Sequence, residues 1–117
     1  MKYKSVIATQ SGGPEVLQIV ENELREPAAG EVRIKTLAAS VTLPEVEARY
    51  GRSPFPPKFP FIPGYAVVGV VDAVGANVTQ SKVGDRAAAL TVYGGYSEVV
   101  YWPKKKLIPV PEALDPA

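Results

Sequence analysis

Tyrosine hydroxyls are among the side-chain groups through which this sequence could do chemistry, and they gain interest because it contains neither histidine nor cysteine. Tyr65 precedes a long apolar run, and Tyr93 stands in the segment TVYGGY. A tyrosine ring can stack against a ligand while its hydroxyl donates a proton or a hydrogen bond. At the start of a strand, however, a tyrosine more commonly packs its ring and leaves the hydroxyl at the rim. The sequence leaves both interpretations open for these two residues.

The absence of imidazole and thiol excludes several classes of site. Structural and catalytic zinc sites nearly always use histidine or cysteine, so we expect no zinc. Nucleophile systems that pair serine or cysteine with histidine are also excluded. A serine–lysine pair is not excluded, although no motif marks one. No disulfide can form, which fits a reducing compartment.

The charge balance gives no sign of a polyanionic partner. The chain has 13 basic and 12 acidic residues and a net charge of +1, whereas nucleic-acid binding depends on a surplus of lysine and arginine. The one basic cluster, residues 104–106, is interpreted as the solvated end of a hairpin. We see no signal peptide and no apolar run long enough to span a bilayer. We therefore expect a cytoplasmic protein with no nucleic-acid or membrane partner.

The segment TLPEVEARYG, residues 42–51, predicts a short helix. Thr42 and Glu45 have the spacing of a capping box. Pro44 is tolerated in the first turn, because its missing N–H would have no helical partner there. The apolar residues that fall on one face of this helix are Leu43, Val46 and Tyr50.

Short β-rich segments separated by turns make up most of the chain. In EVRIKT, residues 31–36, charged and uncharged side chains alternate, which is typical of a half-buried strand. The run YAVVGVVDAV, residues 65–74, is apolar at nearly every position and predicts a strand covered on both faces. We expect further strands at residues 3–9, 16–21, 86–92 and 96–102. This pattern predicts a mainly β fold, a small barrel or sandwich with one short helix.

Residues 52–63 contain five prolines and must be extended. They could be a ligand for an aromatic-lined groove, because PxxP occurs more than once. We favour a stiff connector, since the phenylalanines among the prolines need a core and both flanks are ordered elements. At the other end, PEALDPA resembles the entrance to a helix, so we expect the sequence to be a piece of a longer protein.

Four segments resemble a known family: GGPEVLQIVE, PAAGEVRIKTLAASVT, PFIPGYAVVGVVDAVGANVTQSKVGDRAAALTVYGGYSEVV and LIPVPEALDPA. They are similar to the GroES-like N-terminal domain of medium-chain dehydrogenases/reductases, in the zinc-independent quinone oxidoreductase branch. The resemblance implies a GroES-like, partly open β-barrel over residues 1–117. It also implies that the Rossmann nucleotide-binding domain is absent from this chain, because no two glycines stand at the i, i+2 spacing of GxGxxG.

The resemblance implies NADPH-dependent reduction of quinones or α,β-unsaturated carbonyls by the full-length protein, with this domain inactive alone. Zinc-dependent relatives have a histidine and an acid after the glycine that here is Gly64, whereas this chain has Tyr65 and Ala66. Without a metal to polarise the substrate oxygen, a conjugated acceptor is favoured, because it already stabilises the charge that hydride delivery creates. Groups that orient the nicotinamide and the acceptor are then required, with a hydroxyl or water to supply the proton.

Five positions follow from the resemblance as candidate site residues. Thr42 stands where these reductases usually have asparagine and would contact the nicotinamide end of NADPH, although a helix cap alone also explains it. Glu47 and Ser53 stand where close relatives often carry tyrosines that line the substrate pocket; exposed polar positions are the alternative. Tyr65 and Tyr93 are the other predicted substrate-binding residues. We predict no metal ligand and assign no catalytic residue.

A non-enzymatic GroES-like module that binds or scaffolds partners is the alternative function, since a fold does not determine function. We also expect a homodimer. Without a neighbouring domain, the face around Thr42, Tyr65 and Tyr93 would be bare, and exposed apolar patches promote self-association. The choice between NADPH and NADH would be determined by the nucleotide-binding domain.

Overall fold

A computed structural model describes residues 1–52, 58–79 and 81–111 of the chain. Its strands are β1 (Lys2–Ala8), β2 (Leu17–Glu23), β3 (Glu31–Ala39), β4 (Val67–Val74), β5 (Arg86–Ala89), β6 (Val99–Pro103) and β7 (Ile108–Pro109). The other elements are the helix α1 (Leu43–Arg49) and the 3₁₀ turns η1 (Pro14–Val16) and η2 (Lys104–Lys106). The predicted mainly β fold with one short helix is confirmed.

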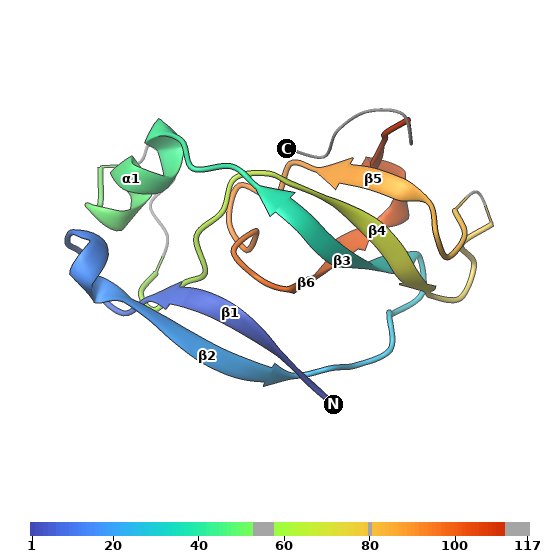
Figure 1. Ribbon diagram of the computed structural model, residues 1–117, viewed down its shortest axis with the longest axis horizontal. Helices are drawn as coiled ribbons and strands as arrows, with labels where there is room; N and C mark the ends of the chain where they lie inside the picture. The colour runs from blue at the N-terminus through green and yellow to red at the C-terminus, as the bar shows by residue number, and fades with distance from the viewer. Residues whose placement is uncertain (53–57, 80, 112–117) are drawn as a thin grey trace.

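The strands form two antiparallel sheets, with β1 and β2 below the others in Figure 1. The larger sheet has the order β6-β3-β4-β5-β7. Residues 96–98, which lead into β6, join the two sheets: the Val6 N–H donates to the Tyr96 carbonyl at 2.8 Å, and the hydroxyls of Ser5 and Ser97 hydrogen-bond at 2.7 Å in the interior. Two sheets joined along one seam make the partly open barrel that the sequence predicted.

The core depends on the alternation of β3 and β4. Val32 and Ile34 of β3 are fully buried, as are Val67 and Val71 of β4. Around them the cluster is completed by Ala87, Ala89 and Val100. Each large aliphatic side chain contributes about 1.5–3 kcal/mol when it is removed from water, so this cluster is the main apolar support of the larger sheet.

Only one face of β4 is fully covered. Val67, Gly69 and Val71 are buried, whereas Val68 and Val70 on the opposite face are half-buried. The prediction that this strand is covered on both faces was therefore wrong. The physical reason is an apolar hollow, described below, which Val68 helps to line.

The helix α1 begins at the predicted cap but buries an unexpected face. Thr42 and Glu45 form the capping box. Leu43, on the apolar face, is 69% exposed, and Tyr50 is also exposed, whereas Glu45 and Ala48 are buried. Polar contacts of Glu45 therefore help to hold the helix, together with hydrogen bonds between Arg49 and Gly12, and sequence periodicity does not report either set.

Two connections bear on the sequence predictions. Residues 53–57 lie outside the described residues, but beyond them the rings of Phe59 and Phe61 pack 5.1 Å apart, and Phe61 also meets Tyr93 at 5.4 Å. This packing supports the connector interpretation of the proline-rich segment. The sequence predicted that residues 104–106 form the end of a hairpin, and this prediction was wrong. They form the turn η2, and the strands that flank it, β6 and β7, lie at opposite edges of the larger sheet.

Candidate functional site

Glu45 is a buried carboxylate that connects the start of α1 to the segment before β4. The residue is only 4% exposed. Its Oε2 accepts hydrogen bonds from the N–H of Thr42 at 2.8 Å and from the Thr42 hydroxyl. Its Oε1 accepts from the N–H of Tyr65 at 2.9 Å and from the Ser40 hydroxyl at 3.4 Å. One carboxylate thus fixes the positions of Thr42 and Tyr65 relative to each other.

Two opposing effects set the pKa of Glu45. Burial raises the pKa of the carboxyl group, but the hydrogen bonds donated by Thr42 and Tyr65 lower it, and the net pKa lies below the ordinary value. A carboxylate has no proton to donate, so all its contacts with donors favour the charged form. Glu45 is therefore ionised at neutral pH.

The segment before β4 also lies along the loop after β5. The Val92 N–H donates to the Tyr65 carbonyl at 2.9 Å, and the Gly95 N–H donates to the Gly64 carbonyl at 3.1 Å. Gly64 has φ +116°, and a Cβ there would lie 2.5 Å from the Cα of Gly95. The two segments can cross this closely because both residues are glycines. The crossing places Tyr93, one residue after Val92, in the same region as Tyr65.

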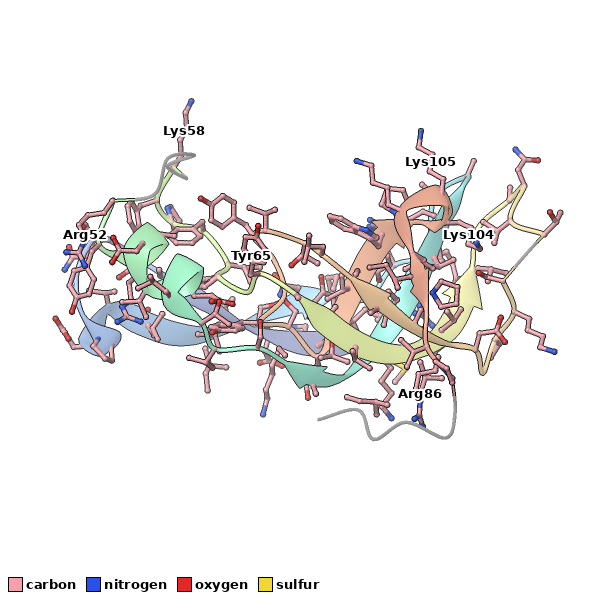
Figure 2. The ribbon with its side chains drawn as sticks, turned by 90° about the horizontal axis from the view of Figure 1, so that it is seen from above. Arg52, Lys58, Tyr65, Arg86, Lys104 and Lys105 are labelled. Atoms are coloured by element: carbon pink, nitrogen blue, oxygen red, sulfur yellow. The ribbon has the colours of Figure 1, made fainter. Side chains whose placement is uncertain are left out.

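The structure thus brings together three of the five predicted site residues. Thr42 is exposed at the cap of α1, and Tyr65 and Tyr93 are half-buried. In Figure 2, Tyr65 lies between α1 and the start of β4. The Tyr93 ring packs edge-on against Phe61 at 5.4 Å, so this ring also supports the loop that carries it.

Glu47 is engaged elsewhere. Its two carboxylate oxygens accept hydrogen bonds from Nε and Nη2 of Arg52, each at 2.9 Å, and this guanidinium lowers the pKa of Glu47. Arg52 lies beside α1 at one end of the molecule, away from the strands of the larger sheet (Figure 2). The carboxylate is half-buried and paired with Arg52, so the arrangement favours a polar position on the helix surface over a residue that lines the substrate pocket. Ser53 lies outside the described residues.

An apolar hollow of about 400 Å³ opens where β3 ends and β4 begins. Ser40 and Ala66 line it, and they lie two residues before Thr42 and one residue after Tyr65. The rest of its wall is formed by Ala38, Ala39, Val67, Val68 and Ala88. Small apolar walls beside a few polar groups are typical of a site for an uncharged organic ligand.

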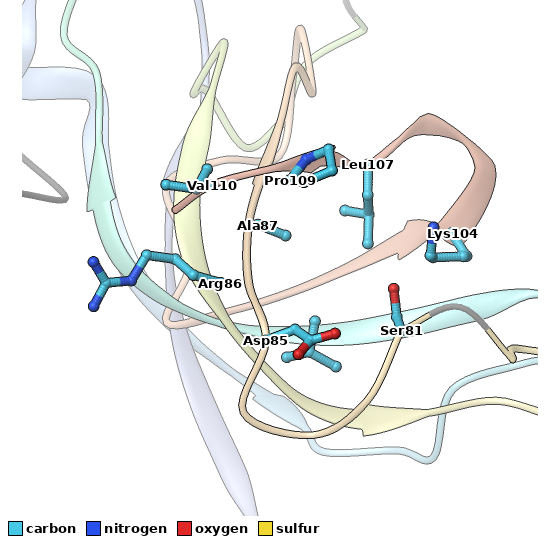
Figure 3. Close-up of a pocket in the computed structure, with 9 residues that line it drawn as sticks. Ser81, Asp85, Arg86, Ala87, Lys104, Leu107, Pro109 and Val110 are labelled. Atoms are coloured by element: carbon cyan, nitrogen blue, oxygen red, sulfur yellow. The ribbon is translucent and has the colours of Figure 1, made fainter. Parts of the chain in front are cut away.

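A second pocket, of about 250 Å³, lies beside β5 and β7 (Figure 3). None of the predicted site residues lines it. Asp85, at its edge, accepts a hydrogen bond from the Lys82 N–H at 3.0 Å in the turn before β5, so its carboxylate is part of that turn. The side chains of Arg86 and Lys104 lie on opposite sides of the pocket in Figure 3, so they do not converge on one ligand.

The donor set of this region does not suit a metal ion. Ala66, at the position where zinc-dependent relatives have an acid, contributes only a methyl group to the hollow. Within the ranges that the structure describes, no three or more carboxylates gather as metal ligands do.

Within the same ranges, no helix has the length and apolar character needed to cross a membrane.

Two residues of this region were not among the predicted site residues. Glu45 was expected only as part of the helix cap. The Tyr96 hydroxyl donates to the Ser40 carbonyl at 3.1 Å; its own burial and the charge of Glu45 raise the Tyr96 pKa, and Arg49 lowers it less. The capping-box spacing reveals the contact between Glu45 and Thr42. The fold brings Tyr65 and Tyr96 to this region from distant parts of the sequence, so no local pattern could have indicated the contact of Tyr65 with Glu45 or that of Tyr96 with Ser40.

Comparison with known proteins identifies the family. Residues 28–112 match the model of the alcohol dehydrogenase GroES-like domain. The chain is 30% identical over 113 residues to the human synaptic vesicle membrane protein VAT-1 homolog-like, covering 97% of this chain and 27% of that protein. It is 38% identical over 105 residues to a quinone oxidoreductase of Pseudomonas aeruginosa, covering 89% and 32% respectively.

Solved structures agree with this result. The crystal structure of the human VAT-1 homolog-like protein superposes with a TM-score of 0.92 at 29% identity, covering 99% of this chain and 38% of that one. Escherichia coli quinone oxidoreductase, solved in complex with NADPH, gives a TM-score of 0.83 at 28% identity, covering 97% and 35%. The chain thus spans about a third of the length of these relatives. It belongs to the alcohol dehydrogenase GroES-like domain family of the medium-chain dehydrogenases/reductases, with quinone oxidoreductases among its relatives.

Proposed function

We propose that this chain is the substrate-side domain of a zinc-independent, NADPH-dependent oxidoreductase that reduces quinones or α,β-unsaturated carbonyls. The observation that carries the proposal is the apolar hollow lined by Ser40 and Ala66, which are close in sequence to Thr42 and Tyr65, in a sequence with neither imidazole nor thiol. The relationship to quinone oxidoreductases, one of them solved with NADPH, supports it.

The residues of this chain would bind and orient the reactants. NADPH supplies a hydride when it is bound. Thr42 would contact the nicotinamide end of the cofactor, and the small apolar residues of the hollow, such as Ala66 and Val68, would hold the ring of the acceptor and exclude water. The hydroxyl of Tyr65, or a water molecule, would supply the proton that the reduced oxygen requires. Tyr93 would support the wall formed by the loop after β5.

A quinone or enone suits such a site because the side chains that line the hollow are small and apolar apart from Ser40, and do not form a ligand set for a Lewis-acidic metal ion. When hydride adds to a conjugated acceptor, the negative charge spreads onto the carbonyl oxygen through the π system. Hydrogen-bond donors and exclusion of water can then be sufficient to stabilise the transition state. An unactivated ketone would need stronger polarisation, such as a metal ion provides.

The proposal is tested by comparing two proteins. Purified 117-residue chain and the product of the complete reading frame are each mixed with NADPH and a benzoquinone or an enone, and NADPH absorbance is followed. We expect oxidation of NADPH by the complete product and none by the 117-residue chain, because nucleotide binding would depend on a separate domain. Turnover by the 117-residue chain would contradict that division, and no turnover by the complete product with any such acceptor would contradict the proposed function.

A binding or scaffolding module is the second candidate. The relative with the TM-score of 0.92 carries a name that specifies no reaction. Affinity purification followed by size-exclusion chromatography distinguishes the two functions. A stable protein complex that forms without NADPH, together with no turnover, would favour the module, whereas NADPH binding and turnover would favour the enzyme.

A further inference from the structure

We propose that Glu45 is a positioning residue of this site, which accepts the hydrogen bond donated by the Thr42 hydroxyl and so leaves the Thr42 oxygen able only to accept a further hydrogen bond. The ligand group recognised by Thr42 must then be a donor, such as an amide N–H. The identity of the ligand rests on the proposed function, whereas the geometry of the two side chains does not.

The first step concerns the proton of Thr42. A threonine hydroxyl has one proton and two lone pairs. Its Oγ1 lies within hydrogen-bond distance of Oε2 of Glu45, and an ionised carboxylate can only accept. The other contacts of Glu45 are with donors too, the N–H groups of Thr42 and Tyr65 and the Ser40 hydroxyl. The proton between Thr42 and Glu45 therefore comes from Thr42.

The second step concerns the lone pairs of the Thr42 oxygen. In the capping box, one of them accepts the backbone N–H of Glu45. The second lone pair is free for a ligand, because Thr42 is exposed. A ligand that offers only acceptors, such as a ketone oxygen, would meet this lone pair with repulsion. A carboxamide N–H would be attracted.

The third step concerns rigidity. Thr42 is fixed through both its N–H and its hydroxyl, and the same carboxylate holds the backbone of Tyr65. Glu45 is almost fully buried, so water competes little for these hydrogen bonds. The asparagine that related reductases usually have at this position would offer both a donor and an acceptor, so Thr42 is the more restrictive group.

Nuclear magnetic resonance of the 117-residue chain tests the positioning role. We expect a slowly exchanging hydroxyl proton of Thr42 and a downfield amide proton of Tyr65. Both signals should change in Glu45→Gln and stay unchanged in Glu47→Gln, which alters a half-buried carboxylate of the same helix that is paired with Arg52. A rapidly exchanging Thr42 hydroxyl in the unaltered chain would overturn the positioning role, even if Glu45→Gln fails to fold.

Cofactor analogues test the recognition of a donor. In the product of the complete reading frame, Thr42→Val is expected to raise the Kd of NADPH by about 2–10-fold, the range for one hydrogen bond. It should leave the Kd of the 3-acetylpyridine analogue unchanged, because a methyl ketone replaces the carboxamide there. Thr42→Ser, which keeps the hydroxyl, should restore the Kd of NADPH while the Kd of the analogue again stays unchanged.

The outcomes of this experiment separate the two claims. Equal weakening of both nucleotides by Thr42→Val, or no effect on either, would overturn donor recognition while NADPH binding by the unaltered protein still supports the proposed function. Binding of neither nucleotide by the unaltered protein would overturn the proposed function and donor recognition together. The resonance experiment decides in every case whether the Thr42 hydroxyl donates its hydrogen bond to Glu45.

Discussion

At the scale of single residues, Glu45 shows how a charged group can organise a small apolar fold. Burial disfavours its charge, but donors from Ser40, Thr42 and Tyr65 surround it. The balance favours the ionised form, as the lowered pKa shows. The same residue therefore anchors α1 and sets the geometry of the candidate site.

The first prediction is a loss of stability in acid. The pKa of Glu45 is lower in the folded chain than in the unfolded chain, so its contribution is present above the unfolded pKa and is lost as the pH falls through the folded pKa. We expect the free energy of unfolding to fall as the pH drops below the ordinary pKa of a glutamate, and to fall less steeply in Glu45→Gln. Urea denaturation at constant ionic strength measures both slopes; parallel curves would show that Glu45 contributes nothing to the dependence.

The second prediction concerns the crossing at Gly64. In Gly64→Ala the new Cβ would lie 2.5 Å from Gly95 Cα, at a residue whose φ is +116°. We expect a destabilisation of about 2–4 kcal/mol, from backbone strain and steric overlap together. Gly94→Ala is the matched control, because its φ is +105° but nothing lies within 4 Å of the new Cβ; it should lose only about 1–2 kcal/mol. Similar losses in both variants by chemical denaturation would show that the crossing is not tightly packed.

At the scale of elements, the strands and the helix differ in how their burial is determined. On β3 the side chains alternate between the core and solvent, so local periodicity decides which are buried. On α1, contacts with distant segments decide which side chains are buried, so the apolar Leu43 stays exposed while Glu45 is buried. The energetic support of the fold is thus expected in the strands, and the geometry of the site depends on the helix cap.

The third prediction tests the support given by β3. Ile34 is fully buried in the core cluster, and Ile34→Ala should cost about 2–5 kcal/mol through lost burial and the cavity left behind. Leu37 on the same strand is 47% exposed, and Leu37→Ala should cost less than about 1 kcal/mol. Thermal or urea denaturation compares the two; an equal loss for both would contradict the assigned core.

These elements also show what the sequence could reveal. The fold class, the cap of α1 and the buried residues of β3 follow from turn residues and local periodicity, and they were predicted. The open face of β4 was not, because the run of valines in that strand is the same whether or not another element covers it. Nor were the contacts of Glu45 with Tyr65, 20 residues away, since hydrogen bonds between distant segments leave no local pattern. The grouping of Thr42, Tyr65 and Tyr93 on one face was expected from the family resemblance, whereas no local pattern in the sequence indicates it.

At the scale of the whole molecule, apolar side chains are exposed on the loops that border the candidate site. Val41 and Leu43 flank Thr42, and Leu90 and Val92 flank Thr91, and all four are exposed. A net charge of +1 gives little repulsion between copies. This surface is therefore suited to contact with another protein surface.

The fourth prediction is self-association of the 117-residue chain through this surface. Sedimentation velocity should detect a dimer that Leu43→Lys disrupts, because a charge placed at an apolar interface has to lose its water. Ile19→Lys on β2 is the control, since Ile19 is similarly exposed at 71% but belongs to the other sheet. A monomer at all concentrations, or equal disruption by both substitutions, would contradict the prediction.

The seam between the two sheets also has a consequence for the order of events during synthesis. Ser5 leaves the ribosome early, but its partner Ser97 follows 92 residues later. At roughly 5–20 residues per second, the first hairpin waits about 5 to 20 seconds for the segment that fastens it. A two-stranded hairpin is barely stable by itself. Completion of this domain is therefore expected only once residues 96–98 have left the exit tunnel, so the first hairpin stays accessible to chaperones and proteases until those residues emerge.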